Sequence, residues 1–257
     1  MTSSDFERAR RWIGEAQRVV VLSGAGISTG SGIPDFRGPQ GVWTKDPHAE
    51  MLSNYETWIS SSKVRRAAWQ SRVAHRFDVI EPNDGHRALL ALEVRGALQL
   101  LVTQNIDGLH HRAGTSAELI VEIHGSARDS LCLACGHRQP IELTFPRILA
   151  GDDDPTCWEL IDGQRCDGML KSATISFGQS LIATDLARAE TAARRTDLLL
   201  AVGSTLAVYP VAQLVPTAKS IGARVVIVNG GPTAMDEIAD ATLSGDISEV
   251  LPALLAT

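Results

Sequence analysis

Residues 18–38 read RVVVLSGAGISTGSGIPDFRG, and this stretch decides the fold. The apolar run at residues 18–23 is typical of a strand buried on both faces of a parallel sheet. Gly24, Gly26 and Gly30 follow it with the spacing G-x-G-x-x-x-G. Glycines let the backbone turn tightly and approach a phosphate closely, and the N-terminus of a following helix attracts an anion. The stretch therefore predicts a dinucleotide-binding loop.

Four more apolar runs are each followed by a polar signature. The runs cover residues 98–103, 119–123, 197–202 and 224–228. The signatures are Gln104-Asn105-Ile106-Asp107, His124, Gly203-Ser204-Thr205 and Asn229-Gly230-Gly231. Short strands alternating with helical stretches predict an α/β fold, a Rossmann-like parallel sheet with helices on both faces. Ligands bind at the carboxyl ends of such strands, where these signatures lie.

Two segments interrupt the alternation. Residues 37–85 contain Trp43, Trp58 and Trp69 in a mixed helical pattern, which indicates a helical insertion with a cofactor loop. Residues 126–175 contain all four cysteines and indicate a second, smaller module. We expect the dinucleotide-binding domain to consist of residues 1–36, 86–125 and 176–257. A capping-box pattern at Ser4–Glu7 predicts a first helix that runs to about Ala16.

The four cysteines favour one tetrahedral Zn²⁺. Cys132 and Cys135 form a C-x2-C pair, and Cys157 and Cys166 follow within 35 residues of the first. Four thiolates leave no open position, so we expect a structural ion. Two disulfides, a redox C-x-x-C pair and His137 as a substitute ligand are the alternatives.

The bulk composition is that of a globular protein. The chain has 257 residues, 44% hydrophobic content and a formal net charge of −6. No apolar run approaches the ~20 residues that span a bilayer, and the N-terminus lacks the features of a signal peptide. These features predict a cytoplasmic protein without membrane partners. The charge argues against nucleic acid and suits a basic, lysine-bearing partner, although it could also serve solubility alone.

Three motifs together carry a family resemblance. Ile33-Pro34-Asp35-Phe36-Arg37-Gly38, Thr103–Asp107 and His124-Gly125 are similar to those of sirtuins, NAD-dependent protein lysine deacylases, and the similarity covers about residues 15–250. The resemblance implies a bacterial-type enzyme that uses NAD and one structural Zn²⁺. Its expected products from an acetyl-lysine protein or peptide are nicotinamide, O-acetyl-ADP-ribose and free lysine.

The resemblance also implies roles for individual residues. His124 would be the general base that deprotonates a ribose hydroxyl. Asn105 would position the nicotinamide ribose and a water, and Asp107 would bind the nicotinamide carboxamide. Phe36 would shield the reactive ribose carbon, and Arg37 would meet the phosphates or ribose. The implied NAD contacts are Gly24, Ala25, Gly26, Ser28, Ile33, Asp35, Phe36, Arg37, Gln104, Asn105, Ile106, Asp107, Gly203, Ser204, Thr205, Asn229, Gly230 and Ile247.

The implied peptide site lies between two segments. Ile175, Phe177 and Gly178 match one side of the family's substrate groove and Val208 the other, and an extended peptide would pair with both. Sirtuins usually have an acidic residue at position 179 and an aromatic one at position 176, where this chain has Gln179 and Ser176. Sirtuins that prefer succinyl groups carry a Tyr-x-x-Arg pair. An ungapped match places Ala68 and Ser71 there, so neutral acyl groups are expected.

Three other functions fit parts of the pattern. A mono-ADP-ribosyltransferase breaks the same glycosidic bond. A non-catalytic NAD- and zinc-binding module would need no base at His124. A Rossmann oxidoreductase carries an acid about 20 residues after its glycine loop. Here Asp46 and Glu50 have that spacing but lie beyond Pro34 and Pro39, and the glycine spacing is one residue longer than usual.

Overall fold

The computed structural model describes residues 3–36, 38, 41–45 and 51–256. Its centre is a parallel sheet with the strand order β11-β10-β9-β1-β2-β3. This is the strand order of a classic dinucleotide-binding sheet, so the predicted Rossmann-like fold is confirmed. The strands are β1 (Val19–Ser23), β2 (Leu98–Thr103), β3 (Ile120–Glu122), β9 (Leu198–Val202), β10 (Arg224–Val228) and β11 (Ala241–Leu243).

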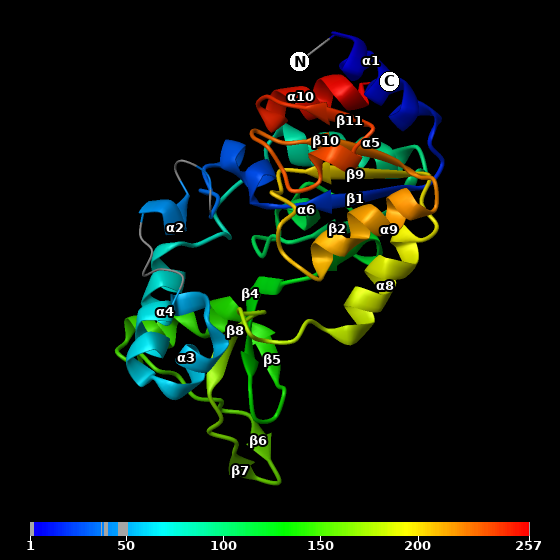
Figure 1. Ribbon diagram of the computed structural model, residues 1–257. Coiled ribbons are helices and arrows are strands. Elements are labelled where there is room, and N and C mark those ends of the chain that lie inside the picture. Colours follow the sequence, from blue (N-terminus) through cyan, green and yellow to red (C-terminus); the bar gives the residue numbers. More distant parts are fainter. Residues whose placement is uncertain (1–2, 37, 39–40, 46–50, 257) are drawn as a thin grey trace.

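Helices cover both faces of the sheet (Figure 1). Val19 and Val21 of β1 belong to one core cluster, together with residues of α1 (Ser3–Glu15), α5 (Asp84–Val94) and α10 (Ile247–Leu255). Val20 and Leu22 belong to a second cluster with α8 (Ala183–Ala193) and α9 (Leu214–Ser220). Successive side chains of a strand point to opposite faces. The continuous apolar runs in the sequence therefore reflect burial on both sides.

The predicted strands agree with the structure to within one residue at each end. The prediction missed β11, which has only three residues. The predicted first helix, residues 4–16, is Ser3–Glu15. The glycine loop is followed by a 3₁₀ helix, η1 (Ala25–Ser31), rather than an α-helix. It ends at Gly32, whose φ of 86° lies in the left-handed region.

The segment between η1 and α5 is helical and packs on the cysteine module. It forms α2 (Val42–Lys45), α3 (Tyr55–Ser60) and α4 (Ser62–Ala74). Trp69 of α4 is buried in a cluster that includes Cys132, Cys157 and Leu170. The Arg65 guanidinium donates two hydrogen bonds of 2.8 Å to the Asp154 carboxylate of that module. Both apolar and ionic contacts thus join α4 to the cysteine module.

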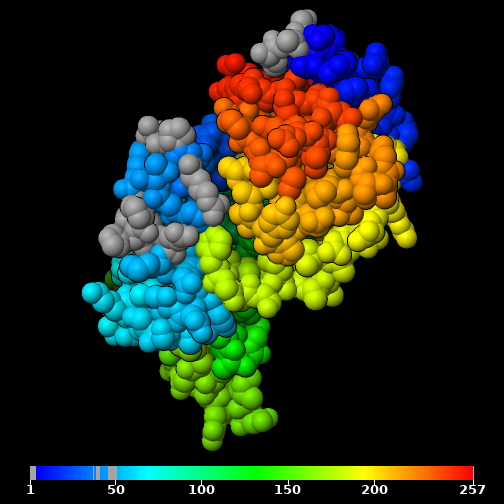
Figure 2. All heavy atoms as spheres, viewed as in Figure 1, coloured from blue at the N-terminus to red at the C-terminus, as the bar shows by residue number. Residues whose placement is uncertain are grey.

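The cysteine module contains a three-stranded antiparallel sheet with the order β5-β4-β8. Its strands are β4 (Gly125–Cys132), β5 (Arg138–Pro140) and β8 (Leu170–Thr174), and it also holds α7 (Phe145–Leu149). A two-stranded hairpin of β6 (Leu160–Ile161) and β7 (Gln164–Arg165) projects from the molecule at its narrow end (Figures 1 and 2). The boundaries of the three sequence segments remain a prediction.

The described fold also contains short helical segments, among them α6 (Leu109–Arg112), η3 (Ala117–Leu119), η4 (Ile141–Leu143), η5 (Val211–Gln213) and η6 (Asp236–Ile238). Over the described ranges, none of the helices has the length and apolar character required to cross a bilayer.

Candidate active site

Two loops interlock at the carboxyl ends of β1 and β9. The Gly24 N–H donates to the Val202 carbonyl (2.9 Å) and the Gly26 N–H to the Gly203 carbonyl (2.8 Å). A Cβ at Gly26 would lie 2.8 Å from the Gly203 Cα, closer than real Cβ contacts. The glycines are therefore required for contact between the loops, whereas the sequence suggested a tight turn. Ala25 lies in the same crossing.

The loop after β2 joins this crossing through side chains. Asn105 Nδ2 donates to the Gly24 carbonyl (3.1 Å) and to Ser28 Oγ (3.1 Å). Ser28 Oγ donates to Asp107 Oδ2 (2.8 Å), and Asp107 Oδ1 accepts from the Leu109 N–H (2.9 Å). The three polar side chains are buried, and each restrains the others.

The environment of Asp107 opposes its ionisation. Burial raises the pKa of the Asp107 carboxyl, whereas the hydrogen bonds from Leu109 and Ser28 lower it and the nearby Glu122 charge raises it further. Both carboxylate oxygens retain accepting capacity beyond the bonds they already make. Asp107 can therefore accept a hydrogen bond from an amide of a bound molecule. Ile106 lies between Asn105 and Asp107 in the same loop.

Two buried histidines lie behind this network. His110 Nε2 contacts Ser23 Oγ (2.8 Å) and His86 Nε2 contacts Ser28 Oγ (3.4 Å). Their rings meet edge to face with centroids 5.0 Å apart. Burial lowers the pKa of His86 to about 4 and that of His110 well below its ordinary value. Both rings are therefore neutral near pH 7 and act as hydrogen-bonding supports.

His124 follows β3 and lies against the loop after β2. Its Nδ1 is 3.1 Å from the Gln104 carbonyl oxygen. A carbonyl only accepts, so Nδ1 carries the proton and Nε2 has a free lone pair. Burial lowers the pKa of His124, although the bond to Gln104 raises it. The neutral ring is thus available as a base near pH 7.

Other predicted cofactor residues surround the same loops. Gln104 Nε2 donates to Ser204 Oγ (2.8 Å), and Ser204 Oγ accepts from the Leu206 N–H (3.2 Å). Asn229 Nδ2 donates to the Gly231 carbonyl (2.8 Å), which shapes the turn after β10. Thr205 and Gly230 are exposed, and Ile247 is buried at the first residue of α10.

The segment after η1 places an aromatic side chain at the edge of the site. Phe36 is 41% exposed, and its ring centroid lies 4.8 Å from that of Trp43. Asp35 Oδ1 accepts from the Gly38 N–H (3.0 Å), and the Ile33 N–H donates to the Ser28 carbonyl (3.3 Å). Arg37, predicted to meet the phosphates or ribose, lies outside the described residues.

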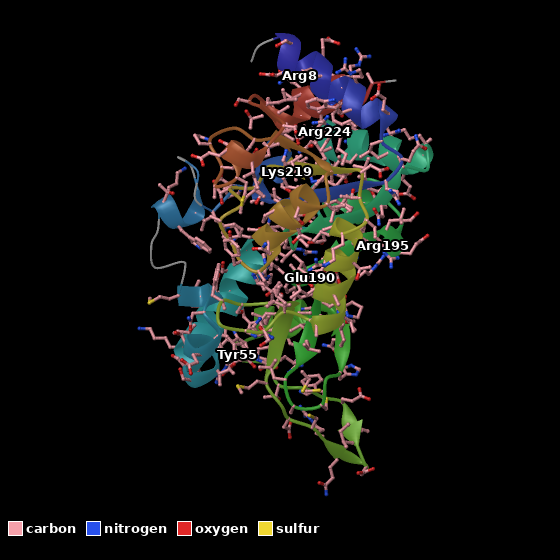
Figure 3. All side chains as sticks on the ribbon, turned by 45° about the vertical axis from the view of Figure 1, so that its right-hand side comes forward. Arg8, Tyr55, Glu190, Arg195, Lys219 and Arg224 are labelled. Atoms are coloured by element: carbon pink, nitrogen blue, oxygen red, sulfur yellow. The ribbon has the colours of Figure 1, made fainter. Side chains whose placement is uncertain are left out.

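The predicted peptide segment connects the base to the helical insertion. The Ile175 N–H donates to the His124 carbonyl (2.7 Å), and Phe177 pairs with Asn54 in a parallel bridge. The Tyr55 N–H donates to the Phe177 carbonyl (2.9 Å), and Figure 3 shows Tyr55 beside the strands of the cysteine module. Gly178 has a φ of 83°, and Val208 lies in the loop that follows Leu206.

The four cysteines form a cluster with the dimensions of a zinc site. Their Sγ atoms all lie within 4.8 Å of one another, and the pairs Cys132–Cys166 and Cys135–Cys157 are 3.7 and 3.8 Å apart. Zn–S bonds of ~2.3 Å in a tetrahedron imply S–S distances of about 3.8 Å. The donor set therefore fits Zn²⁺ and does not require His137, which instead pairs with Glu159 (3.2 Å).

The eight residues between Cys157 and Cys166 contain the β6–β7 hairpin. The Asp167 N–H donates to the Cys157 carbonyl (3.0 Å) and the Cys166 N–H to the Glu159 carbonyl (2.9 Å). These bonds close the hairpin and bring the backbone of Cys166 back beside that of Cys157. The unusual spacing is thus compatible with one four-cysteine site.

The sequence interpretation missed some supporting residues of the site. Ser23, buried at the end of β1, was assigned only to the strand. Arg128 and Glu122, which form an ion pair of 2.7 Å near Asp107, were not considered. Glu122 ends β3 and Arg128 lies in β4. The sequence around either residue does not indicate that their side chains meet.

Comparisons with known proteins agree with this arrangement. The Sir2 family model matches residues 24–210. NAD-dependent protein deacetylase 2 of Streptomyces coelicolor is 45% identical over 237 residues, which are 92% of this chain and 96% of that protein. NAD-dependent protein deacetylase 1 of Bradyrhizobium diazoefficiens is 38% identical over 250 residues, with coverage of 96% and 94%.

Solved structures extend the likeness to three dimensions. A structure described as the basis for the mechanism and regulation of Sir2 enzymes is similar with a TM-score of 0.86 and 34% identity, covering 99% of this chain and 97% of that chain. A Sir2 variant with deacetylated p53 peptide and 3′-O-acetyl-ADP-ribose has a TM-score of 0.84 and 30% identity, with coverage of 96% and 95%. On this sequence and structural similarity, the chain belongs to the Sir2 family.

Proposed function

We propose that this chain is an NAD-dependent protein lysine deacetylase. It would convert NAD and an acetyl-lysine protein or peptide to nicotinamide, O-acetyl-ADP-ribose and the free lysine. One observation carries the proposal: the network of Ser28, Asn105 and Asp107 lies at the carboxyl ends of β1 and β2, and His124 is held against the same loop. NAD supplies an activated ADP-ribosyl group that accepts the acyl group.

Each of the three site residues would have a role that follows from its chemistry. Asp107 would accept a hydrogen bond from the nicotinamide carboxamide. Asn105 would orient the adjoining ribose and a water. His124, protonated on Nδ1 and bonded to Gln104, would remove a ribose hydroxyl proton through Nε2. A base of this kind requires a neutral ring at the working pH, and burial of His124 favours that form.

The remaining predicted residues would bind the two substrates. The interlocked loops at residues 24–28 and 203–205, together with Asn229, Gly230 and Ile247, would hold the ADP-ribose portion. Phe36 would cover the reactive ribose carbon. The backbone of residues 175–178 and Val208 would pair with an extended acyl-lysine peptide, which gives affinity with little dependence on peptide sequence.

Zinc would serve the structure of the module rather than the reaction. Cys132, Cys135, Cys157 and Cys166 would supply four thiolates, and such a site has no position for water or substrate. Thiolate–zinc binding is worth ~10 kcal/mol or more. The metal would therefore hold the β5-β4-β8 sheet and the adjoining hairpin together.

We also propose that the protein acts in the cytoplasm, which fractionation of the source cells tests.

Mass spectrometry tests the proposed reaction directly. An acetyl-lysine peptide is incubated with the protein, with and without NAD, and with the matched variant His124→Ala. Loss of the acetyl group together with O-acetyl-ADP-ribose, only when NAD and His124 are present, is the expected result. Addition of ADP-ribose to the peptide would identify a mono-ADP-ribosyltransferase instead. No change in peptide or NAD would indicate a non-catalytic binding module.

A further inference from the structure

The chain from His124, in the turn after β3, to Arg128, in β4, runs along the loop after β2. Its contacts fall on alternate residues of that loop. His124 Nδ1 donates to the Gln104 carbonyl (3.1 Å). The Ala127 N–H donates to the Ile106 carbonyl (2.9 Å). The next contact in this series is made by the Arg128 side chain at Gly108. The loop that holds Asn105 and Asp107 is therefore fixed at residues 104, 106 and 108.

Arg128 covers Gly108 closely. A Cβ added to Gly108 would lie 2.7 Å from Arg128 Cδ and 2.9 Å from its Nε. The φ of Gly108 is 74°, and this residue precedes α6. Arg128 Nε also donates to Ser126 Oγ (3.1 Å). The guanidinium is thus held in one place across the backbone next to Asp107.

The same guanidinium neutralises a carboxylate close to Asp107. Arg128 Nη2 donates to Glu122 Oε2 (2.7 Å), and His111 Nε2 lies 3.7 Å from that oxygen. Glu122 Oε1 is buried, and the described residues provide it with no hydrogen-bond partner. The Glu122 charge opposes ionisation of Asp107. Loss of Arg128 would remove the guanidinium that pairs with this charge beside the loop.

We propose that Arg128 is a positioning residue for the nicotinamide end of NAD. By covering Gly108 and pairing with Glu122, it keeps Asn105 and Asp107 in the arrangement that accepts the carboxamide. The inference rests on the proposed function, because it assigns that loop to nicotinamide. Arg128 does not touch the reacting atoms, so its effect belongs to binding rather than to the chemical step.

Four variants test the proposal. Arg128→Gln keeps an aliphatic stem over Gly108 but removes the positive charge. Arg128→Lys keeps both the stem and the charge. The double variant Arg128→Gln/Glu122→Gln removes both charges. Arg138→Gln is the matched control, because Arg138 pairs with Asp129 at the same 2.7 Å and is 50% exposed against 44% for Arg128. KM for NAD, Ki for nicotinamide, kcat and Tm are measured for each.

We expect Arg128→Gln to raise KM for NAD and Ki for nicotinamide about tenfold, within the range of couplings in one charged network. Arg128→Lys and the double variant should return both values to within about threefold of wild type, and Arg138→Gln should leave them unchanged. Equal values for Arg128→Gln and Arg138→Gln would overturn the proposal, as would a fall in Tm or kcat with KM and Ki unchanged. An inactive wild type would instead refute the proposed function.

Discussion

Substitution of Gly203 by alanine tests the idea that loop crossing builds the cofactor site. The φ of Gly203 is 63°, and an alanine there costs roughly 1–2 kcal/mol from conformation alone. Its Cβ would also lie 2.7 Å from the Gly26 carbonyl carbon and closer still to the Ile27 nitrogen. Overlap with rigid backbone adds roughly 1–3 kcal/mol. The expected loss of unfolding free energy is therefore about 4 kcal/mol.

Gly222→Ala is the matched control for this prediction. Its φ of 86° is also positive, but an added Cβ would meet nothing within 4 Å. Gly222→Ala should therefore lose only the conformational part of the unfolding free energy, roughly 1–2 kcal/mol. At roughly 2–4 °C per kcal/mol for a chain of this size, Tm should fall by about 12 °C for Gly203→Ala and about 4 °C for the control.

Thermal unfolding monitored by circular dichroism gives the Tm of both variants, and isothermal titration calorimetry gives their affinity for NAD. Gly203→Ala should also weaken NAD binding, because the bond from the Gly26 N–H to the Gly203 carbonyl would be distorted. Equal Tm losses in the two variants, with unchanged NAD affinity, would refute the reasoning. The glycine would then be required only for its φ.

The other predictions concern the base, the metal, the acyl group and pH. His124→Ala should fold normally but lower kcat ~100-fold or more; normal turnover would exclude this base. The acid limb of the wild-type kcat/KM profile should lie below pH 6.5, because burial lowers the pKa of His124. Metal analysis should find one zinc per chain, and Cys157→Ser should lose both zinc and thermal stability; retention of both would reject this ligand set. Acetyl peptides should react faster than succinyl peptides, because Ala68 and Ser71 cannot neutralise an acyl carboxylate and Arg65 and Arg66 pair with aspartates of the cysteine module; faster desuccinylation would show that one of the nearby arginines, Arg65, Arg66 or Arg72, reaches the acyl group. Tm should fall as pH decreases from 6.5 towards 4, since burial lowers the pKa of His86 to about 4 and the unfolded chain then binds the extra proton. The full effect is about 3 kcal/mol, and His86→Gln should flatten this slope; an identical slope would contradict the assignment.

Local sequence patterns determined the main sheet. β2 and β10 lie where the apolar runs at residues 98–103 and 224–228 predicted them. This agreement has a physical reason, because a parallel strand covered on both faces must be apolar throughout. β11 escaped prediction because Ala241–Leu243 belongs to no apolar run, whereas β3, which is equally short, lies within the run at residues 119–123. The polar signatures were also visible, since each directly follows a strand.

The cysteine set could likewise be found from the sequence, since thiolates are rare in this chain and concentrated in one segment. The spacing could not show that Cys157 and Cys166 meet. The hairpin that joins them depends on backbone bonds between Glu159, Cys157 and residues 166–167. These pairings are specified by the chain's tertiary contacts and not by a local residue pattern.

The sequence by itself determined the fold class, the polar residues at the strand ends and the four candidate ligands. Only the tertiary structure decided why particular glycines are needed and which side chains support the site. Gly26 is constrained by Gly203, and Asp107 is surrounded by Ser28 and Glu122. Hydrophobic periodicity is a property of neighbouring residues along the chain, whereas close approach and charge compensation depend on residues that meet only after folding.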